Sequence, residues 1–271
     1  MDQSVGVLKG VILGLVQAFT EFLPVSSSGH LVIMKSLLKV GEVGITMEIV
    51  THFATIVAVV IYLRRHIGRI LRAAYMRATG PKGRLTEEEI RDAGLLALLA
   101  VATVPAALVG LALHGPIERL FSDVTATGIA LVATGCFLLI AGRPRSEQHG
   151  LGLRQALIVG AAQAIAVVPG LSRSGLTVGT GLAQGVPKRE AFEFSLLLSI
   201  PAVAGATLLE AVKGGMGGDL LPILAAAVTA LVAGYAAIAL LFRVVIRNKF
   251  HVFAYYLIPV GALVALVSRF R

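Results

Sequence analysis

Residues Gln17–His30 read QAFTEFLPVSSSGH and interrupt an apolar segment that could otherwise enter a membrane as one helix. Pro24, three consecutive serines and Gly29 lie in this stretch, and proline or glycine at such a position ends a helix. The apolar residues 155–184 are broken in the same way by PGLSRSGLT at Pro169–Thr177. Each half is too short to cross a bilayer, so both segments are predicted to be re-entrant helix pairs, each entering and leaving by one face.

The remaining chain has the composition of a membrane protein. Hydrophobic residues make up 56% of the 271 residues and charged residues only 14%, against about 25% charged residues in ordinary soluble domains. This excludes a soluble enzyme, a disordered chain and a fibrous protein. The predicted fold class is an all-α integral membrane protein with six transmembrane helices and two re-entrant pairs. The six spans are expected at residues 43–63, 93–113, 124–142, 191–212, 220–242 and 250–268.

The basic residues predict the orientation. The formal net charge is +9, and residues 64–92 alone hold eight Lys and Arg. If this loop is cytoplasmic, the topology places 16 basic residues inside and four outside, with both termini external. The positive charge therefore indicates cytoplasmic loops, and no nucleic-acid partner is expected. The single cysteine, Cys136, excludes an intramolecular disulfide framework.

The two broken segments also resemble each other. At an offset of 146 residues, one set of six matches the other: Gly14, Gln17, Ala18, Ser26, Ser28 and Gly29 against Gly160, Gln163, Ala164, Ser172, Ser174 and Gly175. Three spans follow each segment, and three is odd, so the second copy enters from the opposite side. The sequence predicts one membrane domain over 1–271, built as an inverted repeat of residues 1–123 and 124–271.

The first segment carries the residues for acid and proton chemistry. Gln17 and Glu21 are four apart and share a helix face, and a carboxylate in an apolar helix is functional by default. Glu21 could bind a metal or a proton. The serines and glycine that follow could form an anion-binding concavity. Ser27 or His30 would attack or move the proton, and the sequence does not choose between them.

The second segment carries Arg173, the only cation between residues 155 and 186. A guanidinium group suits phosphate oxygens, and the flanking Ser172, Ser174 and Thr177 can donate hydrogen bonds to the same ligand. Inverted packing would bring both loops together, with Ser26 and Ser28 on the opposite wall. The combined pocket suits a phosphate monoester or a diphosphate with a lipid tail, and a divalent cation would neutralise the charge.

At these motifs the sequence resembles the undecaprenyl pyrophosphate phosphatases, the bacitracin-resistance family. Gln17–Glu21 matches the family's (E/Q)xxxE motif, which runs into FLPVSSSGH, and Pro169–Thr177 matches PGxSRSxxT. Many relatives have Glu where Gln17 stands, and an amide adds no negative charge. Glu21, supported by Glu48 and Gln17, is therefore expected to hold Mg²⁺ or Ca²⁺. His52 lies four residues after Glu48 on the same helix face and is interpreted mainly as a packing residue, with support of the site residues as the alternative.

The resemblance implies hydrolysis of undecaprenyl diphosphate to the monophosphate and inorganic phosphate. It places the chain in the bacterial plasma (inner) membrane, with its active site on the outer, periplasmic side. The reaction would recycle the lipid carrier for peptidoglycan and cell-wall synthesis. The expected partners are the polyprenyl diphosphate and the bilayer, with a homodimer left open. A lipid or anion transporter or flippase is the alternative, because inverted repeats with broken helices are typical of transporters. An anion channel is a third hypothesis.

Overall fold

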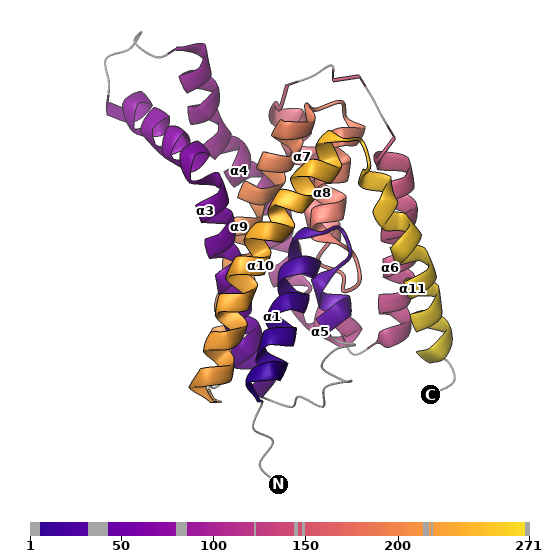
Figure 1. Cartoon of the computed structure of the whole chain (residues 1–271). Coiled ribbons are helices and arrows are strands. Elements are labelled where there is room, and N and C mark those ends of the chain that lie inside the picture. The colour runs from indigo at the N-terminus through magenta and orange to yellow at the C-terminus, as the bar shows by residue number, and fades with distance from the viewer. Residues whose placement is uncertain are drawn as a thin grey trace.

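The computed structural model describes residues 6–31, 43–79, 86–121, 123–143, 146–147, 150–213, 217 and 219–268. Every regular element within these ranges is a helix (Figure 1). Six of the described helices are long and apolar enough to cross a membrane, which confirms the expected all-α class with six spans. They are α3 (Val43–Thr79), α4 (Glu87–Ala112), α6 (Val124–Ala141), α9 (Lys188–Lys213), α10 (Leu220–Ile246) and the 3₁₀ turn Phe250–Phe253 continued by α11 (Ala254–Ser268).

Shorter helices form the two broken segments. The first consists of α1 (Val7–Phe22) and the helical residues 27–31, and the second of α7 (Leu153–Ile165) and α8 (Arg173–Ala183). Figure 1 shows α1 rising from the end where both chain termini lie, whereas α7 and α8 lie toward the opposite end. The re-entrant membrane path and the inverted topology stay predictions.

The broken segments pack reciprocally on the long helices. α1 lies along α10, and α7 lies along α4. A Cβ at Gly14 would come within 2.4 Å of the Ala226 carbonyl oxygen, and one at Gly160 within 2.5 Å of the Ala102 carbonyl oxygen. These two glycines are matching positions of the sequence repeat, so each copy uses its glycine for a close helix approach. This is the arrangement that the predicted repeat would produce.

Several element boundaries differ from the prediction. α3 continues to Thr79 instead of ending at residue 63, because the basic stretch contains good helix formers and no proline. α4 begins at Glu87, before the apolar run, because Thr86 and Glu89 form a capping box. α5 (His114–Phe121) occupies a stretch predicted as a loop. Some basic residues used for the orientation lie outside the described residues: Lys35, Lys39, Lys82, Arg84, Arg145, Arg269 and Arg271.

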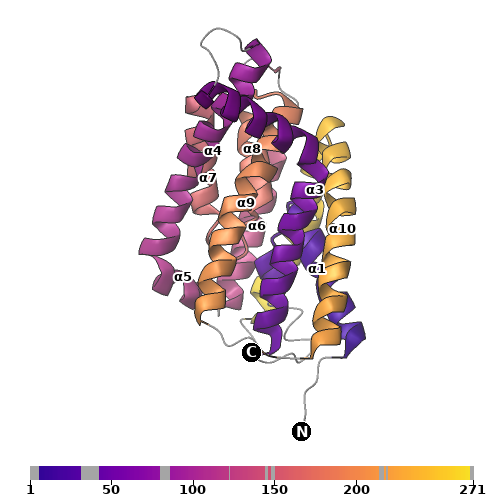
Figure 2. The same cartoon turned by 90° about the vertical axis from the view of Figure 1, so that its left-hand side faces the viewer.

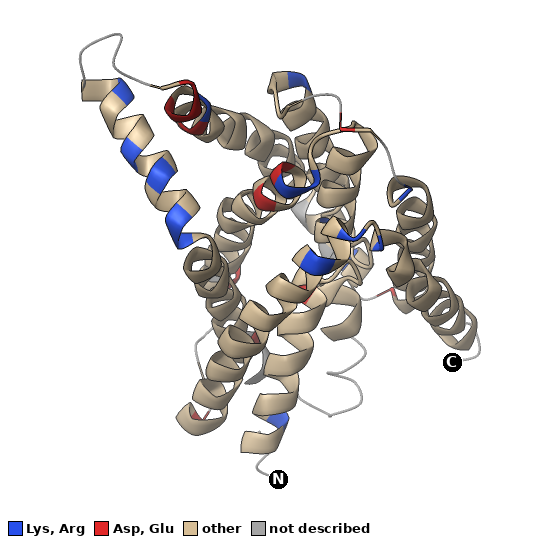
Figure 3. Cartoon of the chain, turned by 45° about the horizontal axis from the view of Figure 1, so that its top comes forward, with Lys and Arg blue, Asp and Glu red and all other residues tan. Residues whose placement is uncertain are grey.

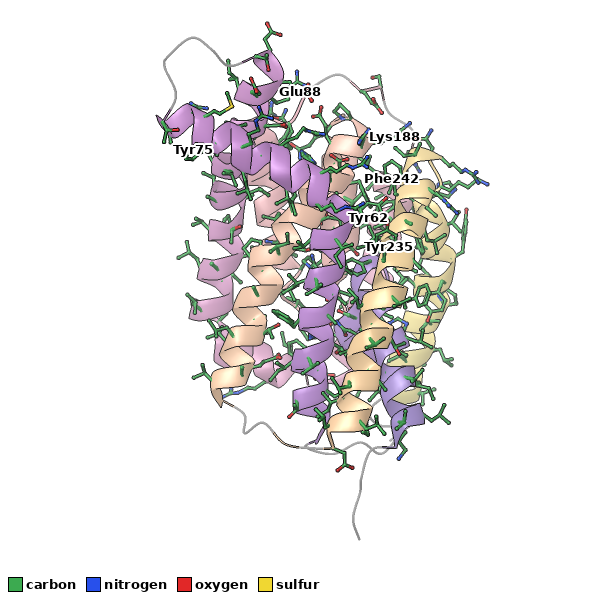
Figure 4. The ribbon with its side chains drawn as sticks, turned by 60° about the vertical axis from the view of Figure 1, so that its left-hand side comes forward. Tyr62, Tyr75, Glu88, Lys188, Tyr235 and Phe242 are labelled. Carbon is green, nitrogen blue, oxygen red and sulfur yellow. The ribbon has the colours of Figure 1, made fainter. Side chains whose placement is uncertain are left out.

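The end of the molecule opposite the termini, called here the basic end, holds most of the positive charge (Figure 3). Arg189 there pairs with Glu193 at 2.8 Å, and Nδ1 of His66 lies 2.8 Å from the same carboxylate. Figures 2 and 4 show α3, α9 and α10 side by side below this cluster. Tyr62 and Tyr235 pack edge to face there, with ring centroids 5.4 Å apart. Aromatic packing therefore fills the helix bundle toward the basic end.

Candidate active site

Gln17 and Glu21 lie on one buried face of α1, as the spacing predicted. The side-chain Nε2 of Gln17 donates to Oε2 of Glu21 at 3.2 Å. Gln17 is 0% exposed and Glu21 is 7% exposed. α1 ends at Phe22, directly before the helix-breaking Pro24. Glu21 therefore stands at the inner tip of the helix, where the chain turns.

The serine turn that follows is held in an unusual backbone conformation. Ser26 has φ +71°, in the left-handed region that residues other than glycine seldom adopt. Its carbonyl oxygen accepts from the amide of His30 at 3.4 Å, and its hydroxyl accepts from the amide of Gly29 at 3.5 Å. Such strained conformations persist only where the surroundings fix them, and they cluster at functional sites.

The second turn positions Arg173 at the start of α8. Gly170 has φ +89°, which glycine adopts without strain. Ser172 then caps the helix, because its hydroxyl accepts from the amide of Gly175 at 3.1 Å. Arg173 is the first residue of α8, directly after this cap.

Hydrogen bonds and one ion pair join the two turns. The amide of Gly170 donates to the hydroxyl of Ser28 at 3.3 Å, and the hydroxyl of Ser174 donates to the carbonyl oxygen of Leu23 at 3.1 Å. The guanidinium of Arg173 pairs with Oε1 of Glu21. The two motifs, far apart in the sequence, therefore form one site.

This site faces a cavity of about 850 Å³. Its lining, taken from the described residues, contains these predicted site residues: Glu21, Ser26, Ser27, Ser28, Glu48, Ser172 and Arg173. Gln17, His30, Ser174 and Thr177 are not part of that lining. The structure therefore brings both motifs to one cavity but gives some of their side chains other contacts.

His30 and Thr177 make contacts with residues outside the cavity lining. Nε2 of His30 lies 2.7 Å from the hydroxyl of Tyr256, and its Nδ1 lies 2.9 Å from the carbonyl oxygen of Ser26. The hydroxyl of Thr177 donates to the carbonyl oxygen of Arg173 at 2.8 Å and also contacts Ser195. Both side chains hold the backbone of the turns that present Ser27 and Arg173.

Two cavity residues were not predicted as site residues. Nε2 of His52 lies 3.7 Å from Oε2 of Glu21, so this histidine is a neighbour of the carboxylate and more than a packing residue. Its spacing from Glu48, one helical turn, was the available signal. Gln163 also lines the cavity, and its match to Gln17 in the repeat was the signal there.

The donor set partly fits a hard cation. The carboxylates of Glu21 and Glu48 and the serine hydroxyls are oxygen ligands, which Mg²⁺ and Ca²⁺ prefer. Ser27 lines the same cavity as these two carboxylates. Among the described residues, however, no group of three or more His, Cys, Asp or Glu side chains could hold a metal ion. A cation held by these residues would therefore need further oxygens from a phosphate ligand and water, as Mg²⁺ commonly takes.

The sequence matches the family described as bacitracin resistance protein BacA over residues 10–263. The chain belongs to the BacA family. It is 36% identical over 275 residues to the undecaprenyl-diphosphatase of Desulforapulum autotrophicum, covering 97% of this chain and 98% of the relative. The chain is 37% identical to the undecaprenyl-diphosphatase of Geobacter sulfurreducens, and the match covers 95% of this chain and 97% of that relative. The chain is 38% identical to the undecaprenyl-diphosphatase of Syntrophotalea carbinolica, and the match covers 96% of this chain and 98% of that relative. Membership of the BacA family confirms the resemblance inferred from the two motifs.

Proposed function

We propose that this chain is a membrane phosphatase that hydrolyses undecaprenyl diphosphate to undecaprenyl phosphate and inorganic phosphate. One observation carries the proposal: Glu21 and Ser27 from the first motif and Arg173 from the second line the same cavity. The BacA-family relatives named undecaprenyl-diphosphatase, matched over nearly their whole length, support the substrate. They do not favour the transporter alternative.

Arg173 binds the terminal phosphoryl group in this proposal. Its planar guanidinium can donate two parallel hydrogen bonds to phosphate oxygens, which a lysine cannot do. Ser172, Ser26 and Ser28 line the same cavity and add hydroxyl groups. The ligand also lies at the N-terminus of α8, where the helix dipole favours an anion.

Ser27 is the nucleophile that the geometry favours, because it lines the same cavity as Glu21 and Arg173, whereas His30 is not part of that lining among the described residues. Its Oγ forms a bond to the terminal phosphorus as its proton passes to Glu21. The bond from that phosphorus to the bridging oxygen breaks, and undecaprenyl phosphate leaves with the electron pair. Water then attacks the phosphoserine, releasing inorganic phosphate and restoring Ser27. His30, held by Ser26 and Tyr256, keeps the turn in place.

A divalent cation, Mg²⁺ or Ca²⁺, fits the carboxylates of Glu21 and Glu48. Gln17 supports Glu21 by donating to its second oxygen. When bound, the cation would neutralise phosphate charge that Arg173 alone leaves uncompensated.

The cavity extends away from the basic end. Its lining includes Leu111 near the end of α4, Ile117 of α5 and Glu210 near the end of α9, all toward the termini. Basic residues favour the cytoplasmic side, so the cavity would face the outer surface of the bacterial plasma membrane. There the enzyme would recycle the lipid carrier for cell-wall synthesis; a homodimer stays a prediction.

Purified protein mixed with undecaprenyl diphosphate tests this function directly. We expect inorganic phosphate and undecaprenyl phosphate to appear in equal amounts. Protein reconstituted in vesicles separates the alternative: a transporter would move the lipid or an anion across the bilayer and leave the diphosphate intact. Transport without phosphate release would contradict the proposal.

A further inference from the structure

Gln163 on α7 is a buried amide whose hydrogen bonds are unused. It is 2% exposed, and neither its Nε2 nor its Oε1 has a hydrogen-bond partner among the described residues. A buried amide left in this state costs free energy, so native proteins almost always pair such groups. Gln163 lines the same cavity as Ser172 and Arg173. Its partner is therefore expected to be something that enters the cavity.

The comparison with Gln17 shows why this amide is available. Gln17 and Gln163 are matching positions of the repeat, and Gln17 donates to Glu21 four residues later. The residue four positions after Gln163 is Val167, whose apolar side chain cannot accept a hydrogen bond. In the first copy of the repeat, the amide of Gln17 is thus bonded to a carboxylate. In the second copy, the amide of Gln163 stays available for a ligand.

A second unused group lies on the same cavity. The hydroxyl of Thr207 on α9 is buried and has no hydrogen-bond partner in the part of the chain that the structure describes. Thr207 also lines the cavity. The cavity lining therefore includes two residues, on two helices, whose buried polar groups have no partner among the described residues.

We infer that Gln163 is a substrate-binding residue whose amide Nε2 donates a hydrogen bond to a phosphate oxygen of the diphosphate headgroup. This inference rests on the proposed function and names a further residue for it. A second cationic side chain at this position would attract Glu21 or Glu48. The neutral amide of Gln163 can donate to a phosphate oxygen without that competing attraction. Its Oε1 remains able to accept from a water molecule or a protonated phosphate oxygen.

Replacing Gln163 by leucine separates a binding role from a structural one. A hydrogen bond to a charged group contributes enough to change binding about 10- to 100-fold. We expect Gln163→Leu to raise KM by that factor with a smaller change in kcat, the pattern for lost binding. Stability should be unchanged or higher, because the variant removes two unpaired polar atoms. Gln163→Glu should bind still more weakly, because its charge repels phosphate.

Gln155→Leu is the matched control, since Gln155 is half-buried on the same helix and is not part of the cavity lining among the described residues. Gln163→Met, which keeps the side-chain length, repeats the test if the leucine variant folds poorly. An unchanged KM in both variants would overturn the inference, as would a fall in thermal stability together with normal KM.

Calorimetry with inorganic pyrophosphate adds a readout that does not depend on turnover. Wild-type protein and Gln155→Leu should bind it, and Gln163→Leu should bind about 10- to 100-fold more weakly. Equal binding by all three, or none by wild-type protein, would contradict the role of Gln163. Lack of phosphate release by wild-type protein that still binds pyrophosphate would instead reject the proposed hydrolysis.

Discussion

Glu21 and Arg173 form an ion pair between residues 152 positions apart in the chain. Their side chains are only 6% and 17% exposed, so the two charges neutralise each other in an apolar surrounding. Each motif carries one charge, and neither charge would be stable there without the other. The pair therefore holds the two turns together and also places a phosphate-binding group on the cavity wall.

Removing one charge of this pair should affect both folding and activity. Arg173→Gln leaves the Glu21 carboxylate buried without its counter-ion, a change that costs about 3–5 kcal/mol in buried pairs. We expect a lower unfolding temperature in detergent and no measurable phosphate release. Arg173→Lys should recover part of the stability but little activity, because lysine cannot make the bidentate contact.

The double variant Glu21→Gln with Arg173→Gln separates the two effects. It removes both charges, so its thermal stability should return toward that of the wild-type protein. Phosphate release should stay absent. Activity in the double variant would show that the pair is structural only.

Gly170→Ala should destabilise the second turn. Gly170 has φ +89°, and a Cβ there would lie 2.5 Å from the carbonyl oxygen of Thr127. Strain of this kind costs about 1–3 kcal/mol, so the unfolding temperature should fall. Gly94→Ala is the control, because a Cβ there meets nothing within 4 Å in the described structure and alanine favours a helix. Equal stability of both variants would argue against this geometry.

Chelation should remove activity if Glu21 and Glu48 hold a cation with the substrate. We expect EDTA to stop phosphate release and added Mg²⁺ or Ca²⁺ to restore it. Glu48→Gln should raise the cation concentration needed for half-maximal rate. Full activity of metal-stripped protein in EDTA is the result that would reject the cation.

Ser27 and Tyr256 provide a test of which side chain reacts. Ser27→Ala removes the proposed nucleophile and should abolish phosphate release. Tyr256→Phe removes one hydrogen bond of His30 and should cost about 1 kcal/mol of stability, with kcat nearly unchanged. Trapping of a phosphorylated enzyme by rapid acid quench would identify Ser27 directly. A phosphohistidine at His30 would reverse this assignment.

The sequence predicted the helical membrane class from local patterns and the contact between the two motifs from the sequence repeat. Long uncharged runs identify spans by length alone, and one buried arginine requires a buried acid nearby. The capped start of α4 and the helical basic stretch of α3 were missed, because hydropathy ignores capping and helix propensity.

Side-chain directions within the motifs were harder to predict. Three serines and a histidine in one turn look equivalent in the sequence, but Ser26 adopts a positive φ and His30 contacts Tyr256 on a distant helix. The direction of a side chain in such a turn depends on partners more than 200 residues away, which periodicity does not encode. His52 and Gln163 were likewise recognisable only from their neighbours in space.

The hydroxyls of Ser28 and Ser174 fasten each turn to the backbone of the other, so each half of the chain completes its partner's loop. A fragment ending near residue 123 would contain the acid without the guanidinium, and the remainder would contain the reverse. Co-expressed fragments would have to associate before either acquired a formed site. Duplication of an ancestral half-length gene, followed by divergence of the copies, would leave the carboxylate of Glu21 in one copy and the guanidinium of Arg173 in the other.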